Sequence, residues 1–201
     1  MDTGLDATKY THTASKDAYK AFYDEQGNHY GNHHLDENFP RAKFILDRVK
    51  PTDYVMEMGC QTGGITRLVA PKVYMVIANE LSDSYRNRAE EVLRDIHNLD
   101  IVSGFAEDLG TMLFFQEVFN VVIAMELLEH VADPAKICES AHACLRDGGL
   151  ALFSVPKGYT DALGEHVREF TEESFRALLI GYFRDISIFD EGEWFLAEAY
   201  K

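Results

Sequence analysis

The sequence has 201 residues, 46% of them hydrophobic, and its 19 Lys and Arg against 34 Asp and Glu give a formal net charge of −15. This length and composition fit one globular domain and exclude a disordered chain, a collagen and a small disulfide-rich scaffold. The acidity also argues against nucleic acid and an anionic membrane as partners, because both are bound by clustered Lys and Arg.

The three cysteines and the first residues bear on the compartment. Cys60, Cys138 and Cys144 are odd in number and lack a paired spacing, so they do not indicate a disulfide framework. The chain begins Met-Asp-Thr-Gly, without the basic and then apolar order of a secretion signal. No apolar run approaches the roughly 20 residues of a transmembrane helix. We therefore expect a cytoplasmic protein with no membrane segment.

The polar N-terminal segment differs from the rest of the chain. Residues 1–38 are rich in Tyr, His, Asn and Asp, which predicts an N-terminal extension or lid with one short helix near residues 16–23. From Phe39 onward apolar residues recur at helical spacing, which predicts a helix up to Val49 that Pro51 ends. We expect residues 39–201 to form the main domain.

Strands and helices alternate through that domain. Short apolar runs predict strands over residues 54–58, 73–78, 101–102, 121–124, 150–155, 184–189 and 193–199. Helices are predicted between them, over residues 65–70, 83–93, 134–145 and 172–180. Ser82 or Asp83 can cap the second of these helices, and Thr171 can cap the last.

This alternation predicts parallel strands joined by right-handed crossovers. No helix separates the last two predicted strands, so we expect them to form an antiparallel hairpin around residues 190–192. The expected fold class is α/β, a doubly wound, mostly parallel seven-stranded sheet with one antiparallel strand and helices on both faces. Such sheets bind ligands beyond the carboxyl ends of their strands.

A glycine-bearing turn follows the first predicted strand. Gly59, Gly63 and Gly64 let the backbone approach a ligand closely, and the helix start beyond them suits a carboxylate or a phosphate. Gln61 stands where a dinucleotide fingerprint has its second glycine, so a dinucleotide fits poorly. Glu80 follows about 20 residues later, where an acid can bind both hydroxyls of a ribose. The glycine turn and Glu80 together favour a site for a nucleoside-bearing ligand. The alternative is that the glycines only shape the turn and Glu80 only faces water.

Several segments carry a resemblance to a known family. Residues 57–63 read Glu-Met-Gly-Cys-Gln-Thr-Gly, and residues 104–109 read Gly-Phe-Ala-Glu-Asp-Leu. Residues 125–134, 145–149, 153–156 and 165–171 continue the series. In this order and spacing they resemble class I methyltransferases that use S-adenosylmethionine, in the group that includes ubiquinone-pathway O-methyltransferases. Glu80 matches the acid that closes the second strand of that family.

The resemblance implies a site for S-adenosylmethionine. The residues expected to bind this cofactor are Arg41, Glu57, Gly59, Cys60, Gln61, Gly63, Glu80, Leu81, Ala106, Glu107 and Met125. The glycine turn would hold the methionine part, and Glu80 would clasp the ribose. The adenine would lie against Leu81, Ala106 and Glu107. Arg41 would meet the carboxylate of the cofactor, unless it is an exposed helix charge.

Methyl transfer to a hydroxyl needs a group that orients the acceptor or takes its proton, and histidine suits that role near neutral pH. His130 follows the fourth predicted strand and His166 lies in the last matching segment, so both are catalytic candidates. Local packing is the alternative for His130. With Glu126 and Glu129 the two histidines also resemble the metal site of small-RNA ribose methyltransferases, but we expect no metal.

The predicted function is transfer of a methyl group from S-adenosylmethionine to a small-molecule acceptor, at a hydroxyl oxygen. His33 and His34, together with Tyr23 and Tyr30 of the same N-terminal segment, could line the acceptor site. Two departures from the family keep an alternative open. Gln61 replaces a glycine, and Phe105 replaces an aspartate that reads the adenine amino group, which would suit a non-catalytic binding or regulatory module. A metal-assisted RNA ribose methyltransferase is a further alternative.

Overall fold

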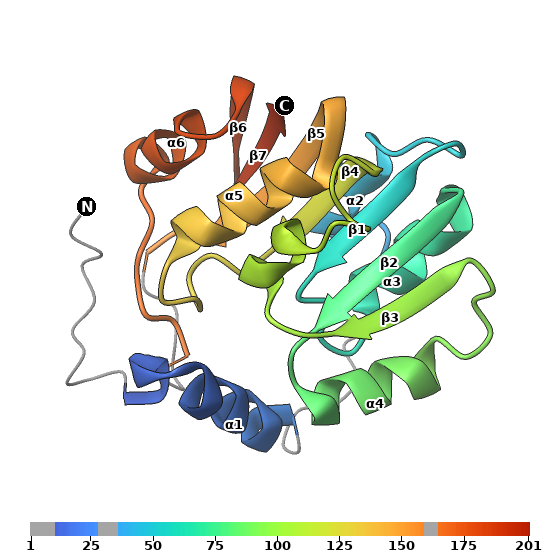
Figure 1. The fold of residues 1–201 in the computed structure, drawn as a ribbon. Helices are drawn as coiled ribbons and strands as arrows, with labels where there is room; N and C mark the ends of the chain where they lie inside the picture. Colours follow the sequence, from blue (N-terminus) through green and yellow to red (C-terminus); the bar gives the residue numbers. More distant parts are fainter. Residues whose placement is uncertain (1–10, 28–35, 159–164) are drawn as a thin grey trace.

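A computed structural model describes residues 11–27, 36–158 and 165–201. Seven strands form one sheet in the order β3-β2-β1-β4-β5-β7-β6 (Figure 1). Their bounds are β1 Tyr54–Met58, β2 Met75–Glu80, β3 Leu99–Ser103, β4 Phe119–Met125, β5 Leu145–Pro156, β6 Arg184–Glu191 and β7 Trp194–Tyr200. Only β7 runs antiparallel to its neighbours, β5 and β6. The predicted α/β fold with one antiparallel strand is confirmed.

Helices cover both faces of this sheet (Figure 1). The α-helices are α1 Lys16–Gly27, α2 Pro40–Leu46, α3 Gly64–Val69, α4 Asp83–Val92, α5 Pro134–Cys144 and α6 Glu172–Ile180. Short 3-10 helices are η1 Thr11–Ala14, η2 Ala70–Lys72 and η3 Ala106–Thr111. The predicted caps are confirmed, because the Ser82 hydroxyl accepts from Tyr85 N and Thr171 forms a capping box with Ser174.

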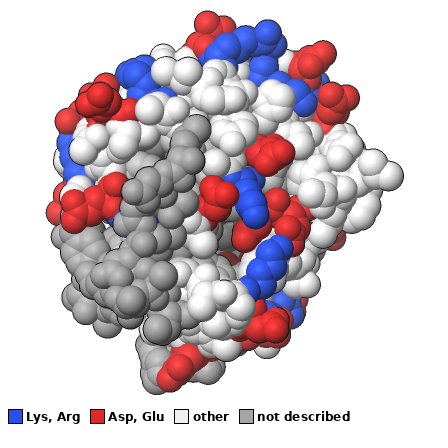
Figure 2. Space-filling model, turned by 60° about the vertical axis from the view of Figure 1, so that its left-hand side comes forward, with Lys and Arg blue, Asp and Glu red and all other residues white. Residues whose placement is uncertain are grey.

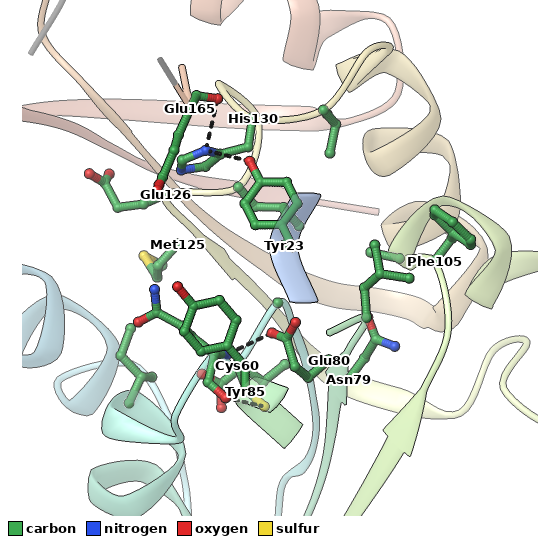
Figure 3. A pocket seen from close by; sticks show the side chains of 18 of the residues that line it. Tyr23, Cys60, Asn79, Glu80, Tyr85, Phe105, Met125, Glu126, His130 and Glu165 are labelled. Carbon is green, nitrogen blue, oxygen red and sulfur yellow. Dashed lines mark hydrogen bonds between the residues drawn. The ribbon is translucent and has the colours of Figure 1, made fainter. Parts of the chain in front are cut away.

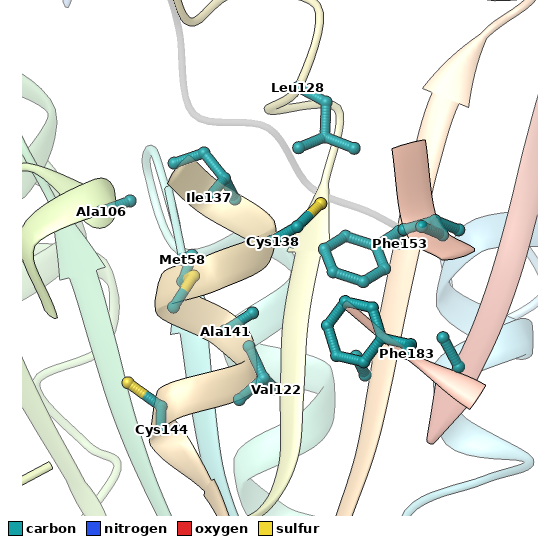
Figure 4. Close-up of a cluster of buried hydrophobic side chains, with 14 of the residues drawn as sticks. Met58, Ala106, Val122, Leu128, Ile137, Cys138, Ala141, Cys144, Phe153 and Phe183 are labelled. Carbon is teal, nitrogen blue, oxygen red and sulfur yellow. The ribbon is translucent and has the colours of Figure 1, made fainter. Parts of the chain in front are cut away.

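The two faces of the sheet carry separate apolar cores because side chains alternate along each strand. Met56 of β1 packs with α5, α6 and η3, whereas Val55 packs with α2, α3 and α4. Figure 4 shows the first core, where Cys138 and Cys144 of α5 are fully buried. Both act as small apolar residues of the core.

Helix α1 departs from the expected loose extension. It is longer than the predicted short helix and lies beside the start of α4, near the carboxyl ends of the strands (Figure 1). The Ser82 hydroxyl donates to Tyr23 O at 3.1 Å and the Ser84 hydroxyl donates to Asp24 O at 2.7 Å. The Lys20 ammonium also pairs with Asp83 at 2.8 Å. The predicted lid residues His33 and His34 lie outside the described residues.

The surface and the helices bear on the two expected absences, a nucleic-acid partner and a membrane segment. Lys and Arg lie among Asp and Glu, with no continuous basic patch on the face shown in Figure 2. Within the described ranges, none of the helices combines the length and the apolar character needed to cross a bilayer.

Candidate functional site

A cavity of about 360 Å³ opens at the carboxyl ends of the central strands, where the topology predicted a ligand (Figure 3). Its wall comes from the segments that follow β1, β2, β3 and β4, and α1 contributes two tyrosines. The lining residues are Tyr19, Tyr23, Arg41, Glu57, Gly59, Cys60, Gln61, Gly64, Ile65, Asn79, Glu80, Leu81, Tyr85, Phe105, Ala106, Glu107, Met125, Glu126, Leu127, His130, Val131 and Glu165.

Three residues of the turn after β1 adopt the left-handed backbone conformation, with positive φ. Gly59 has φ 74°, Gln61 φ 52° and Gly63 φ 83°. A side chain costs roughly 1–2 kcal/mol in this conformation, so Gln61 is strained where the related family has glycine. The peptide N–H groups of Gly59 and Cys60 both donate to Asn79 O at 2.9 Å. The turn is thereby fixed to the end of β2.

Glu80 is the acid at the end of β2, and it faces the cavity rather than solvent. Its side chain accepts hydrogen bonds from Gln61 N and Ser82 N, both at 2.8 Å. Burial raises the pKa of Glu80, and these two hydrogen bonds oppose the rise. Each carboxylate oxygen has a further lone pair, so the residue can still accept bonds from a ligand.

Glu57 lies in β1 directly below the turn. The Thr66 hydroxyl donates to it at 2.6 Å, and the residue is almost fully buried. Burial raises the pKa of Glu57 to about 7, although the bond from Thr66 works in the opposite direction. The carboxyl is thus poised between its neutral and charged forms near physiological pH.

A polar cluster follows β4. Glu126 has φ 51° and accepts hydrogen bonds from the Ser154 hydroxyl at 2.8 Å and from the Trp194 indole N–H at 2.9 Å. The Arg41 guanidinium lies 3.4 Å from the same carboxylate and 5.0 Å from the centre of the Trp194 ring. The Arg41 side chain is only 18% exposed, so it is not an exposed helix charge.

His130 lies at the other end of the cavity from the glycine turn (Figure 3). Its Nδ1 lies 3.0 Å from the Tyr23 hydroxyl and 3.2 Å from Glu165 O. The His166 ring meets it edge to face, with centroids 4.7 Å apart. The Tyr19 ring lies beside Tyr23 at 4.8 Å. Local contacts therefore fix the orientation of the imidazole.

The structure brings most of the predicted site together. All of the predicted residues line the cavity except Gly63 and His166. Gly63 caps α3 instead, with its Cα facing Leu93 of the following crossover. His166 contacts the His130 ring but does not line the cavity. Phe105 also lines the cavity, and Lys16 Nζ lies 4.6 Å from the centre of its ring.

Tyr23 lines the cavity, as expected for the N-terminal segment, but sequence reasoning missed the contributions of Tyr19 and of β7. Tyr19 and Tyr23 are four residues apart, so one face of α1 presents both to the cavity. This four-residue spacing is the sequence feature from which the shared orientation of the two tyrosines could have been predicted. The bond from Trp194 to Glu126 joins residues 68 positions apart, and no local pattern indicates it.

Comparison with known proteins finds a matching domain family and a set of related enzymes. The methyltransferase domain family matches residues 28–187. The ubiquinone biosynthesis O-methyltransferase of Nitrosomonas europaea is 31% identical over 114 residues, covering 54% of this chain and 48% of that protein. That of Coxiella burnetii is 27% identical over 119 residues, covering 57% and 48%. The chain thus spans about half the length of the curated relatives it matches.

Solved structures share the fold. An S-adenosylmethionine-dependent methyltransferase from Aquifex aeolicus matches with a TM-score of 0.67 at 14% identity, covering 82% of this chain and 90% of that chain. One from Mesorhizobium loti matches with a TM-score of 0.66 at 15% identity, covering 82% and 99%. Since the family match extends over most of the sequence, the chain belongs to the methyltransferase domain family, whose members use S-adenosylmethionine.

Proposed function

We propose that this protein transfers the methyl group of S-adenosylmethionine to a hydroxyl oxygen of a small-molecule acceptor in the cytoplasm. The observation that carries the proposal is one cavity that joins the turn after β1, the acid Glu80 and the polar residue His130. The cofactor supplies the labile methyl, so the protein has to bind it, align the acceptor and exclude water.

The cofactor would occupy the end of the cavity near the turn. Glu80 would accept the ribose hydroxyls while it holds Gln61 N and Ser82 N. Glu57 would orient the amino group through the turn, and Arg41 would meet the carboxylate. Arg41 lies 3.4 Å from Glu126, and its guanidinium has five N–H donors, so it can bind a second carboxylate at the same time.

The acceptor would lie between Met125 and the tyrosines of α1. His130 supplies an imidazole at this end, and it would orient the acceptor hydroxyl or take its proton. Residues 1–38 would act as the lid over both ligands, and α1 supports this because it places Tyr19 and Tyr23 on the cavity wall. Residues 39–201 would form the catalytic domain.

Calorimetric titration with S-adenosylhomocysteine, the demethylated cofactor, tests the first half of the proposal. One site per chain is expected, and no detectable heat at millimolar ligand would refute it. A panel of phenols and alcohols with labelled S-adenosylmethionine tests the second half. Binding without transfer to any acceptor would favour the non-catalytic module instead.

A further inference from the structure

Ser82 lies outside the cavity, yet it contacts a residue at each of the two ends of the cavity. It stands between β2 and α4 and has no exposed surface. Its peptide N–H donates to Glu80 at 2.8 Å, and its hydroxyl donates to Tyr23 O at 3.1 Å. Glu80 lies near the turn after β1, whereas Tyr23 lies next to His130. Ser82 thus joins a residue expected to bind the cofactor to a residue beside the expected acceptor.

The same joint connects the end of α1 to the start of α4 (Figure 1). The last carbonyl groups of one helix and the first N–H groups of another need partners from outside each helix. Here the Ser84 hydroxyl donates to Asp24 O at 2.7 Å, and Asp83 N donates to the Asp24 carboxylate, also at 2.7 Å. The negative end of the α1 dipole therefore meets the positive end of the α4 dipole, which is favourable. These contacts fix the position of α1 on α4.

Gly27, the last residue of α1, shows how closely the two helices approach. It is buried, and an added Cβ would overlap Ser84 Oγ and lie 3.2 Å from Tyr85 N. A side chain at this position would have to displace α1 or turn the Ser84 hydroxyl away from Asp24 O. The joint is therefore closely packed, and α1 has little freedom to shift along α4.

The opposite end of α1 is held at η3. The Lys16 ammonium forms an ion pair with Asp108 of η3 and lies 4.6 Å from the centre of the Phe105 ring. The segments that follow β2 and β3 are those where the family resemblance places the ribose and the adenine. Both anchors of α1 therefore lie on segments that would bind the adenosine part of the cofactor.

Tyr23 carries the position of α1 to His130. Its carbonyl is held by Ser82, and its hydroxyl lies 3.0 Å from His130 Nδ1. The Tyr23 ring packs against Tyr19 and Phe22, with centroids 4.8 and 5.1 Å apart, so the hydroxyl moves with the backbone. A hydrogen bond weakens once its heavy atoms are more than about 3.2 Å apart, so a shift of α1 by about 1 Å would break this contact.

We propose that Ser82 is a positioning residue. It couples ligand binding at Glu80 to the contact of Tyr23 with His130. A ligand that donates to Glu80 keeps this carboxylate in the conformation that accepts from Ser82 N, and so holds the start of α4 on which α1 docks. The coupling is reciprocal, because docking of α1 must raise the affinity for that ligand by the same factor.

For the reaction, this inference rests on the proposed function. His130 is aligned for the acceptor only while α1 is docked, and a cofactor at Glu80 favours docking. The cofactor is therefore expected to bind before the acceptor. Loss of the Ser82 hydroxyl should lower the transfer rate, because a misplacement of about 1 Å can cost about 10²-fold even when it arises far from the chemistry. The placement of Tyr23 by Ser82 does not depend on which ligand binds.

Two measurements on the ligand-free full chain test the positioning role. Ser82→Ala removes the hydroxyl but keeps the N–H group that donates to Glu80. Hydrogen–deuterium exchange of the α1 amides should become faster by about tenfold or more, because the bond that holds α1 is lost. The imidazole NMR signals of His130 should shift as they do in Tyr23→Phe. Thr171→Ala is the matched control, since it removes the N-cap of α6 instead of that of α4, and it should change neither measurement.

A second variant keeps the test independent of how well Ser82→Ala folds. Gly27→Ala crowds the joint while leaving the cap of α4 and the cavity lining in place, and it should reproduce both changes. Thermal melting followed by circular dichroism shows which variants are folded. Wild-type exchange of α1 and wild-type His130 signals in both variants, or in the one that folds, would overturn the inference.

Calorimetry with S-adenosylhomocysteine tests the coupling. Ser82→Ala and Gly27→Ala should each weaken binding by about fivefold or more, although neither residue lines the cavity. Glu25→Ala on the exposed side of α1 is the control and should keep the wild-type affinity. Wild-type affinity in both joint variants would overturn the coupling. A wild type that does not bind S-adenosylhomocysteine would instead refute the proposed function, while the ligand-free measurements still decide the role of Ser82.

Discussion

The two ends of the cavity are built differently. The turn end, formed by Glu57, Gly59, Gln61 and Glu80, is assembled from two adjacent parallel strands and their backbone hydrogen bonds. The α1 end, formed by Tyr19, Tyr23, His130 and Glu165, joins three segments that are distant in sequence. Backbone hydrogen bonds within the sheet fix the turn end, whereas the α1 end depends on side-chain contacts between segments and can vary without changing the fold.

Replacing His130 by Ala tests the α1 end and should have the largest effect. Transfer to an acceptor found in the panel should fall by about 10²- to 10⁴-fold, because the group that orients the acceptor or takes its proton is lost. Affinity for S-adenosylhomocysteine should stay near the wild-type value. His97→Ala, at an exposed histidine, is the control and should keep the wild-type rate. If His130→Ala lost cofactor affinity as strongly as it lost transfer rate, the two ends of the cavity would not be separable.

Replacing Glu80 by Ala tests the turn end. Cofactor affinity should weaken by about 1.5–3 kcal/mol, the range for hydrogen bonds to a charged group. Calorimetry measures the loss, and Glu90→Ala on the exposed face of α4 is the matched control. Because Glu80 also accepts hydrogen bonds from Gln61 N and Ser82 N, the unfolding free energy of the variant should be measured together with its cofactor affinity. Unchanged affinity in a folded variant would contradict the assigned role.

Two glycines with similar dihedral angles show how tightly the turn end is packed. Gly63 has φ 83°, and an added Cβ would lie 2.5 Å from Leu93 Cδ1, whereas Gly148 has φ 69° and open space around it. Each Ala variant should lose roughly 1–2 kcal/mol from the left-handed backbone. Gly63→Ala should lose about 1–3 kcal/mol more from crowding. Urea unfolding measures both, and equal losses would argue against the tight contact.

The raised pKa of Glu57 predicts a pH dependence of stability. Burial raises this pKa to about 7 from 4.5, so the folded state binds the proton more tightly than the unfolded state. The stabilisation is complete below about pH 4.5 and is lost as the pH rises through about 7. Glu57→Gln should remove a slope of up to about 1.4 kcal/mol per pH unit from the unfolding free energy in that window.

Urea titrations between pH 5 and pH 8 measure this slope. Glu90→Gln, on the exposed side of α4, should keep the wild-type slope. Identical pH profiles for Glu57→Gln and the wild type would show that Glu57 titrates alike in the folded and unfolded states.

The same contrast explains what the sequence could reveal. The turn end follows from local rules, since glycines after a strand and an acid at the end of the next strand are brought together by parallel pairing alone. The pairing of Met58 with Asn79 is the register that does this. The mostly parallel sheet and the hairpin of β6 and β7 were likewise predictable, because the alternation of strands and helices and the missing last helix are local features of the sequence.

The α1 end could not be predicted in this way. Nothing near Tyr23 indicates that its hydroxyl meets His130 across 107 positions, because that contact depends on how α1 docks on α4. Likewise the helical spacing that identified α2 did not reveal that Arg41 would stack on Trp194. Long-range side-chain contacts of this kind leave no periodic trace in the sequence.

The hydrogen bond from Trp194 to Glu126 has a practical consequence. The first residue of β7 steadies the carboxylate that faces Arg41, although 68 positions separate the two bonded residues. A variant truncated before the final hairpin would lose an edge of the sheet and also the support of a residue on the cavity wall.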